Sequence, residues 1–305
     1  MNNDQRSQRK KRLIVAADDF GLTEGVNQAI ATAYRNGILT TASVIVNGRA
    51  FELAVGIVKN NPGLDVGLHL NLTEGLSTAD PTGIPSLANL SGFLYDHPLK
   101  LAAALFRGRV RSADLETEIR TQIEKTIGSG LEITHIDGHK HVHVIPQVFQ
   151  AICHAAPDYG IQAIRSTVER TPRLGSLLFR NRQTWPQILK QYAFAKAATA
   201  ACVFSRRGQR EQVLITPTRF YGISQTGFLD LETFSDVLHD LNGGIAEIMC
   251  HPGYLDDDLK STPTRLRFQR ERELEMLTGR EVRDLIKRLG IALVSYKDLL
   301  EDYGT

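Results

Sequence analysis

Residues 134–146, with the sequence THIDGHKHVHVIP, hold four histidines and one aspartate, in a chain of 305 residues that has nine histidines in all. Imidazole nitrogens and carboxylate oxygens bind divalent metal ions, and histidine also transfers protons near neutral pH. The cluster therefore predicts a metal site. His139 and His143 would share a face only in a regular helix, which the valines and the proline of the segment argue against. We do not expect all four histidines to be ligands.

Further groups capable of chemistry stand where strands are expected to end. Asp18 and Asp19 close the apolar run LIVAADD, His69 lies in VGLHLNL and His251 in EIMCHPGY. In a parallel α/β fold these positions converge in space with His139, although they are far apart in the sequence. One carboxylate and two imidazoles can hold a divalent ion and leave positions for water and substrate, while a second carboxylate takes a proton from the water. His251 is either an acid for the leaving group or a structural histidine.

Strands and helices are expected to alternate along the chain and thereby to position these groups. In the expected strand 64–72, His69 lies on the face opposite to the leucines and valine. This alternation predicts a mainly parallel sheet covered by helices, open or closed into a barrel, in one domain over residues 1–305. The expected strands are 12–21, 41–46, 64–72, 133–139, 162–166, 246–254 and 292–296. The expected helices are 25–37, 50–63, 114–130, 147–160, 230–244, 265–278 and 280–289.

Two segments depart from this alternation. Residues 75–113 contain several prolines and glycines and are expected to form a long loop excursion. Residues 165–212 carry ten Lys or Arg against two acids and several aromatic residues, which predicts a basic helical insertion at about 166–212. This insertion is either a solvated helical pair packed on the barrel or a surface for anionic lipid or a lipid-linked substrate. Nucleic acid is a weaker alternative.

Composition excludes several classes of protein. A net charge of +2 does not indicate a nucleic-acid partner, and three separated cysteines predict neither a disulfide framework nor a thiolate zinc site. The basic run QRKKR precedes too short an apolar stretch for a signal peptide, and no other segment is long enough to span a membrane. A cytoplasmic location is therefore expected. The sequence motifs of serine hydrolases, P-loop NTPases and dinucleotide-binding proteins are missing.

Four motifs follow one another along the chain: LIVAADDFGLTEGVNQAI, VGLHLNLT, THIDGHKHVHVIP and EIMCHPGY. In their residues and their order they resemble the motifs of the YdjC-like family of carbohydrate deacetylases, and this resemblance covers the chain almost from end to end. The resemblance implies a distorted TIM-like (β/α) barrel and the hydrolysis of an N-acetyl group from an amino sugar, with release of acetate. It also implies that Asp19, His69 and His139 are the metal ligands. The family uses magnesium, whereas two imidazoles and one carboxylate suit zinc or another transition metal better.

The roles of the remaining residues follow as hypotheses from this resemblance and from general mechanism. Asp18 would be the general base, His251 would protonate the departing amine, and Arg165 would orient Asp18 or a substrate oxygen. The other members of the histidine cluster are expected to support the ligands or to contact substrate; they are His135, Asp137, His141 and His143.

Several alternatives stay open. A metal-dependent phosphoesterase on a similar barrel could use the same histidines, and a sugar-binding barrel without catalysis would release no acetate. The insertion at 166–212 is missing from compact relatives that resemble diacetylchitobiose deacetylases, and relatives associated with hopanoid biosynthesis act on a glycolipid. Peripheral membrane or glycolipid contact through 166–212 is therefore considered. A homodimer is considered as a separate possibility, and a nucleic-acid partner is not expected.

Overall fold

The computed structural model describes residues 10–171, 173–207 and 214–304. Within them, eight strands form one sheet in the order β5-β4-β3-β2-β1-β7-β6, with β8 also paired to β1. Every strand pair is parallel, as the alternation of strands and helices predicts. The strands are β1 (Lys11–Phe20), β2 (Thr41–Val44), β3 (Asp65–Leu70), β4 (His135–Gly138), β5 (Ala163–Ile164), β6 (Arg219–Tyr221), β7 (Gly244–Cys250) and β8 (Ala292–Leu293).

Irregular pairing joins the two edges of this sheet. Isolated parallel bridges connect Ala163 with Ile215 and Glu169 with Phe220, and the amide of Ile164 donates to the carbonyl of Ile215 at 2.9 Å. The sheet therefore curls round into a barrel with an incomplete seam between β5 and β6. The predicted distorted TIM-like barrel is confirmed.

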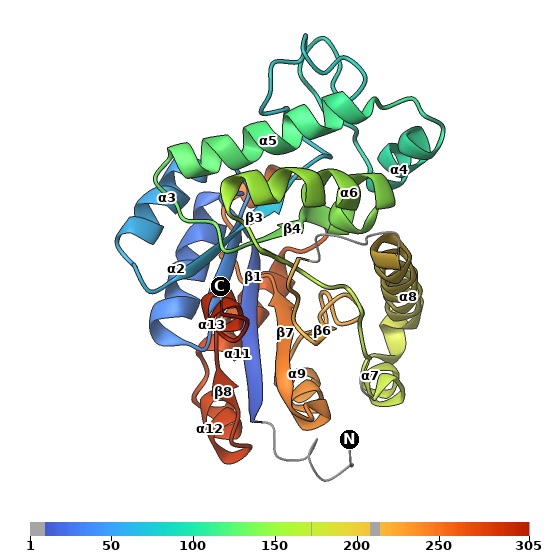
Figure 1. Cartoon of the computed structure of the whole chain (residues 1–305). Helices are drawn as coiled ribbons and strands as arrows, with labels where there is room; N and C mark the ends of the chain where they lie inside the picture. Colours follow the sequence, from blue (N-terminus) through green and yellow to red (C-terminus); the bar gives the residue numbers. More distant parts are fainter. Residues whose placement is uncertain (1–9, 172, 208–213, 305) are drawn as a thin grey trace.

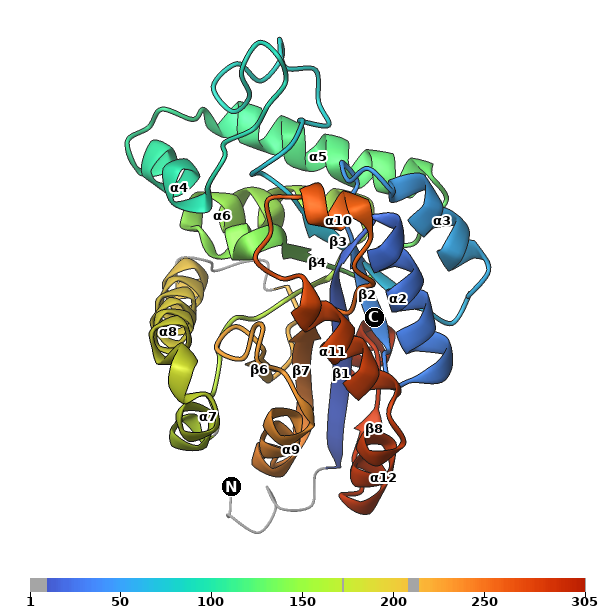
Figure 2. The same ribbon diagram turned by 180° about the vertical axis from the view of Figure 1, so that it is seen from behind.

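Helices surround the outer face of the sheet (Figures 1 and 2). The α-helices are α2 (Glu24–Asn36), α3 (Phe51–Lys59), α4 (Pro98–Phe106), α5 (Ser112–Gly128), α6 (Pro146–Ala155), α7 (Leu174–Arg180), α8 (Trp185–Arg207), α9 (Leu231–Asp240), α10 (Asp257–Ser261), α11 (Phe268–Thr278), α12 (Arg280–Arg288) and α13 (Tyr296–Glu301). The 3-10 segments are η1 (His139–Val144), η2 (Ala156–Tyr159) and η3 (Arg182–Thr184). Among the described helices, none is long and apolar enough to cross a membrane.

The twofold alternation of the strands decides which side chains enter the barrel. In β1, Leu13 and Val15 pack in the main hydrophobic core, whereas Ile14 lies in a separate cluster with Tyr296 inside the barrel. Asp18 is four residues after Ile14 and therefore lies on the same face of the strand, which brings Asp18 to the interior. The same rule applied to β3, whose leucines also belong to the main core, brings His69 to the interior, as the sequence predicts.

Some local predictions are wrong. The excursion 75–113 is not all loop, because α4 forms within it; the ring of His97 caps the amide of Leu99, and Pro98 suits the first helical turn. Tyr296, predicted at the end of a strand, begins α13 instead. Ser295 and Asp298 form a capping box there, which ends the short strand β8. Helix α10 and strand β6 were not predicted.

The basic insertion is helical, as predicted, although residues 172 and 208–212 of it lie outside the described part of the chain. Helices α7 and α8 form a pair at one side of the barrel in both views (Figures 1 and 2). Thr167 donates to the carbonyl of Ala198, and Ser205 donates to the carbonyl of Val144, each at 3.1 Å. The first bond attaches α8 to the segment that follows β5, and the second attaches it to Val144 at the end of η1, the segment that follows β4, so the insertion adjoins the histidine cluster.

Candidate active site

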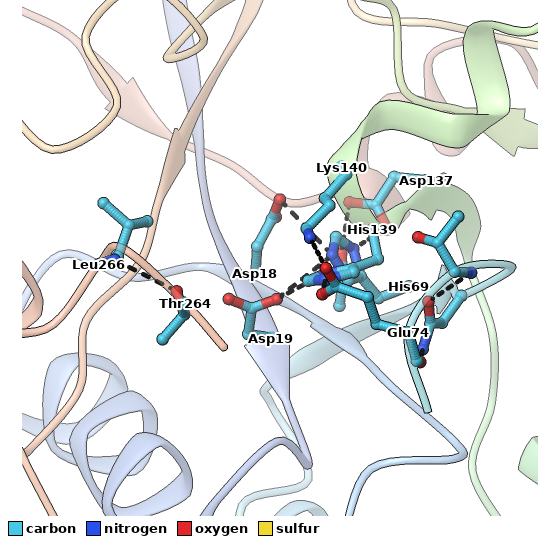
Figure 3. A network of polar contacts seen from close by, with 12 residues as sticks. Asp18, Asp19, His69, Glu74, Asp137, His139, Lys140, Thr264 and Leu266 are labelled. Atoms are coloured by element: carbon cyan, nitrogen blue, oxygen red, sulfur yellow. Dashed lines mark hydrogen bonds and ion pairs between the residues drawn. The ribbon is translucent and has the colours of Figure 1, made fainter. Parts of the chain in front are cut away.

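The end of β1 turns at Asp19, whose φ is 68°. In a regular strand Asp18 and Asp19 would point to opposite faces. The left-handed conformation, with the register shift between Ala17 and Phe20, allows both carboxylates to approach His69 (Figure 3). A positive φ at a non-glycine residue is uncommon and concentrates at functional sites. Both aspartates are buried, so the strand end offers two carboxylates at one place.

The first group of ligand-type side chains consists of Asp19, His69 and His139, whose ligand atoms lie within 4.8 Å of one another. Asp19 Oδ1 is 3.6 Å from Nε2 of His69 and 3.0 Å from Nδ1 of His139. One anionic oxygen with two imidazole nitrogens is a donor set that fits zinc or another divalent transition metal. The structure thus brings together the three side chains that the family resemblance implies as metal ligands.

The charge on His139 depends on its acidic neighbours. Burial lowers the pKa of the ring, but hydrogen bonds to Asp19 and Glu74 outweigh burial and raise the pKa to about 9. Lys140 forms an ion pair with Glu74, and Glu74 Oε2 lies 3.9 Å from His139 Nε2. A metal ion bound at this ring would have to displace its proton, because only a free ring nitrogen is a ligand.

A second group comprises Asp18, His69 and Asp137, also within 4.8 Å of one another. The distance from His69 Nδ1 to Asp137 Oδ1 is 2.7 Å, and Nε2 of the same ring lies 4.0 Å from Asp18 Oδ2. Burial acts to raise the pKa of Asp137, but Arg165 and His69 lower it far below its usual range. The ionised carboxylate can only accept, so His69 donates from Nδ1 and its Nε2 faces the first group.

Arg165 is the buried cation that holds three carboxylates in place. Its terminal nitrogens donate to both oxygens of Asp18 at 2.8 Å, and Nη1 lies 2.6 Å from Asp137 Oδ2. Its Nε donates to Glu247 at 2.8 Å, and the hydroxyl of Tyr296 donates to the same glutamate at 2.7 Å. Burial raises the pKa of Asp18 despite Arg165 and His69. The residue predicted to orient Asp18 therefore touches it through a bidentate ion pair.

His251 follows β7 and lies near the charged side chains of Asp19 and Arg270. Its backbone amide donates to Glu273 Oε2 at 2.6 Å, and burial lowers the pKa of its ring to about 3 in spite of the nearby Asp19. The ring is therefore neutral at physiological pH. Burial also raises the pKa of Glu273 to about 7.

The other three histidines of the cluster belong to neither ligand group. His135 stacks on Tyr296 with ring centroids 3.6 Å apart and lies 3.3 Å from the hydroxyl of Ser43. His141 and His143 are buried with centroids 6.0 Å apart, and neither nitrogen of His143 has a hydrogen-bond partner in the part of the chain that the structure describes. Lys140 and His141 have positive φ values, so the segment is not a regular helix. Among the described residues, only His139 of the four belongs to a ligand group.

Sequence reasoning missed two residues of this site on α11. Arg270 donates to Asp19 Oδ2, and Glu273 accepts from His251, although neither stands in a recognised motif. A signal was present in the helix pattern. Positions 270, 273, 274 and 277 form one helical face and are all buried, so two charged residues share a face with Leu274 and Leu277. Charged side chains on an apolar face need buried partners.

Comparisons with known proteins give the family to which the chain belongs. The sequence profile of the family described as YdjC-like protein matches residues 12–288. A carbohydrate deacetylase from Brevibacillus brevis is 31% identical over 94% of this chain and 99% of its own length. A chitooligosaccharide deacetylase from Escherichia fergusonii is 29% identical over 95% of this chain and 100% of its own.

A solved structure is similar over nearly the whole fold. The crystal structure of a candidate cellobiose-phosphate cleavage protein from Enterococcus faecalis has a TM-score of 0.75 at 24% identity and covers 95% of this chain and 99% of its own. At this identity the likeness supports the barrel fold alone. The family profile spans most of the chain and includes the ends of β1, β3, β4 and β7. The chain belongs to the YdjC-like family.

Proposed function

We propose that this protein is a hydrolase that removes an N-acetyl group from an amino sugar and releases acetate. The observation that carries the proposal is the pair of adjacent carboxylates beside His69, with Asp18 held by Arg165 and Asp19 against His139. Two carboxylates in two environments can divide the tasks of proton acceptor and metal ligand. Relatives named carbohydrate deacetylase cover almost the full chain and support this reaction class.

The proposed cofactor is one divalent metal ion held by Asp19, His69 and His139. When bound, it would supply a positive charge that polarises the amide carbonyl and makes a water molecule more acidic. The donor set favours zinc or another transition metal, whereas the family resemblance favours magnesium. The bond from His69 to Asp137 supports this assignment, since it holds a proton on Nδ1 and leaves Nε2 as the nitrogen that faces Asp19.

The chain's own residues would move the protons. Asp18 Oδ2 would accept a proton from the attacking water, because burial raises the pKa of Asp18 and makes the carboxylate more basic. Arg165 would keep that carboxylate in place. As the bond between the acetyl carbon and the sugar nitrogen breaks, His251 would deliver a proton to the nitrogen. Because its ring is neutral beforehand, we propose that His251 gives its ring proton to the nitrogen and regains one, so that the proton which Asp18 takes from the water balances the one that the amine receives.

Acetate release tests the reaction. The purified protein is stripped with a chelator, and Mg²⁺, Mn²⁺ or Zn²⁺ is added back singly with N-acetylglucosamine oligomers or an N-acetylated glycolipid. We expect acetate and free amine in equal amounts, loss of both on chelation, and a fall of about 10²- to 10⁴-fold in Asp18→Asn and His251→Ala. His154→Ala, a change at an exposed ring bonded to Glu116, is the matched control.

The outcomes separate the alternatives. Normal turnover in both Asp18→Asn and His251→Ala would contradict the assigned roles, and activity that survives chelation would remove the metal. A protein that binds two or three metal ions and cleaves phosphate esters would be the phosphoesterase. Sugar binding without acetate from any substrate would favour a binding barrel.

We propose further that the insertion brings this site to a lipid-linked sugar or an anionic membrane. Phe179, Trp185, Leu189 and Phe204 are exposed on α7 and α8. No acid occurs between residues 170 and 207, and Arg182 lies 4.5 Å from the ring centroid of Phe179. A basic surface with exposed aromatic side chains is typical of membrane contact. Phe194 of α8 lies 6.1 Å from His141 between ring centroids, so the insertion extends to the histidine cluster.

Liposome sedimentation tests this contact. We expect binding to anionic but not neutral vesicles, and loss of binding in a Phe179→Ser/Trp185→Ser double variant and in a protein without the insertion. Equal binding with and without these residues would contradict the proposal.

We also propose a cytoplasmic location, because the three cysteines are buried and form no disulfide. Gel filtration would show whether the protein is a homodimer.

A further inference from the structure

Helix α11 carries two charged residues into the interior of the protein. Arg270 and Glu273 are three positions apart and only 1% and 2% exposed. Residues at this spacing lie on one helical face. Burial of a charge costs free energy unless a partner compensates it, and well-packed apolar residues would often be equally stable. Such a pair therefore calls for a reason other than stability.

The partners of Arg270 explain its position. Its Nη2 donates to Asp19 Oδ2, and its Nε donates to the carbonyl of Leu266 at 3.1 Å. Nη1 is buried without a partner among the described residues. In the view of Figure 3, Leu266 and His69 lie on opposite sides of Asp19. The guanidinium is thus held by the carbonyl of Leu266 and contacts Oδ2 of Asp19, the oxygen that does not face His69 or His139.

The backbone near His251 leaves room for this side chain. A Cβ atom at Gly253 would lie 2.9 Å from Cδ of Arg270, closer than real side chains approach. The amide of Gly253 also donates to the carbonyl of Arg270 at 3.3 Å. Arg270 therefore packs directly against Gly253 beside Val26 of α2, and any larger residue at 253 would displace it.

The two oxygens of Asp19 consequently have separate partners. Oδ1 lies 3.0 Å from His139 and 3.6 Å from His69, whereas Oδ2 is bound by Arg270. A carboxylate without such a restraint could rotate and present either oxygen or both. A donor bound to one oxygen selects a single-oxygen ligand of fixed direction.

We infer that Arg270 is a positioning residue that holds Asp19 so that only Oδ1 faces His69 and His139. The inference rests on the metal centre of the proposed function. Positioning by Arg270 and a purely electrostatic effect of its charge predict opposite changes in metal affinity. Removing a cation next to a metal ligand should strengthen the binding of another cation if charge alone mattered. If Arg270 acts by fixing geometry, its removal should weaken metal binding.

Calorimetric titration of Mn²⁺ and of Zn²⁺ into the chelator-treated full chain tests this difference without measuring turnover. We expect Arg270→Met to weaken binding about 10- to 100-fold, the usual effect of removing a group that orients a ligand. Arg270→Lys should also weaken it, because one ammonium lacks the planar fork that reaches both Leu266 and Asp19. Arg272→Met, on the exposed side of α11, is the matched control and should bind as the wild type does.

Chemical rescue provides a second measurement. Millimolar guanidinium should restore part of the metal affinity of Arg270→Ala and should not affect Arg272→Met. Far-UV circular dichroism and the melting temperature identify a variant that fails to fold, in which case Arg270→Lys carries the test.

The outcomes are distinct. Unchanged or tighter metal binding in Arg270→Met overturns the inference, whatever the wild type does with a sugar. A wild-type chain that binds no divalent ion overturns both the inference and the metal centre. Metal binding that weakens as expected in a protein without acetate release supports the inference and contradicts the proposed reaction.

Discussion

His69 Nδ1 and Asp137 Oδ1 lie 2.7 Å apart on adjacent strands, and this bond aims the opposite nitrogen of the ring at Asp19. Asp137 also accepts a hydrogen bond from Ser43 Oγ at 2.9 Å and forms an ion pair with Nη1 of Arg165. One buried carboxylate thereby fixes the ring of a proposed ligand and the cation that holds the proposed base.

Replacement of Asp137 should therefore affect both metal binding and stability. In Asp137→Asn we expect metal affinity to fall about 10- to 100-fold, because the ring of His69 loses its charged acceptor. The free energy of unfolding should fall by about 3–5 kcal/mol, because Arg165 loses a buried partner. Calorimetry and urea unfolding measure the two effects. Ser43→Ala, which removes a neutral donor to the same carboxylate, should change metal affinity little. Wild-type affinity in Asp137→Asn would show that His69 does not need this acceptor.

The strand pattern explains why part of this arrangement was predictable. Alternation in β1 and β3 places Asp18 and His69 inside the barrel, and that rule depends only on neighbours in the sequence. The positive φ of Asp19 depends on the register shift against β2, which no local pattern encodes. The sequence therefore predicts that both aspartates and His69 gather at the strand ends, but not the backbone turn at Asp19 that directs the second carboxylate toward the ring.

Long-range partners were the least predictable part. Asp19 and Arg270 are 251 positions apart, and Arg270 stands among other charged residues of a helix. Only burial on the tertiary fold distinguishes it from its exposed neighbours. Helix α4, by contrast, carried a local signal in His97 and Pro98 that the high proline and glycine content of the surrounding loop obscured.

Glu273 should influence turnover through His251. In Glu273→Ala the buried amide of His251 loses its acceptor, and the ring should shift from its place beside Asp19. Displacement of a catalytic group by about 1 Å can lower turnover about 100-fold. We expect kcat to fall while metal affinity stays as in the wild type, because His251 is not a proposed ligand. Glu273→Gln keeps a carbonyl acceptor and should lose much less. Equal losses in both variants would show that the charge, and not the hydrogen bond, matters.

Gly67 should be needed for the ring of His135. A Cβ atom at position 67 would lie 2.3 Å from Cε1 of that ring, which is stacked on Tyr296. Gly67→Ala should therefore lower the free energy of unfolding by about 1–3 kcal/mol through overpacking. Gly128→Ala at the end of α5, where a Cβ atom would meet nothing within 4 Å, should be neutral or stabilising by up to about 1 kcal/mol. Urea unfolding compares the two, and equal stabilities would mean that the ring moves aside without cost.

Glu169 should make stability depend on pH near the start of the insertion. Its carboxylate accepts from the amides of Ile223 and Ser224. Burial raises its pKa to about 7 despite those bonds and the nearby Lys196. The folded protein therefore binds an extra proton between the unfolded value, near 4.5, and about 7. Its contribution to stability is lost as pH rises through that window, by about 3 kcal/mol at most. In Glu169→Gln the free energy of unfolding should fall less between pH 5 and pH 8 than in the wild type, whereas the exposed change Glu132→Gln should leave the difference as it is. An unchanged pH dependence in Glu169→Gln would show that this carboxylate is ionised throughout the range.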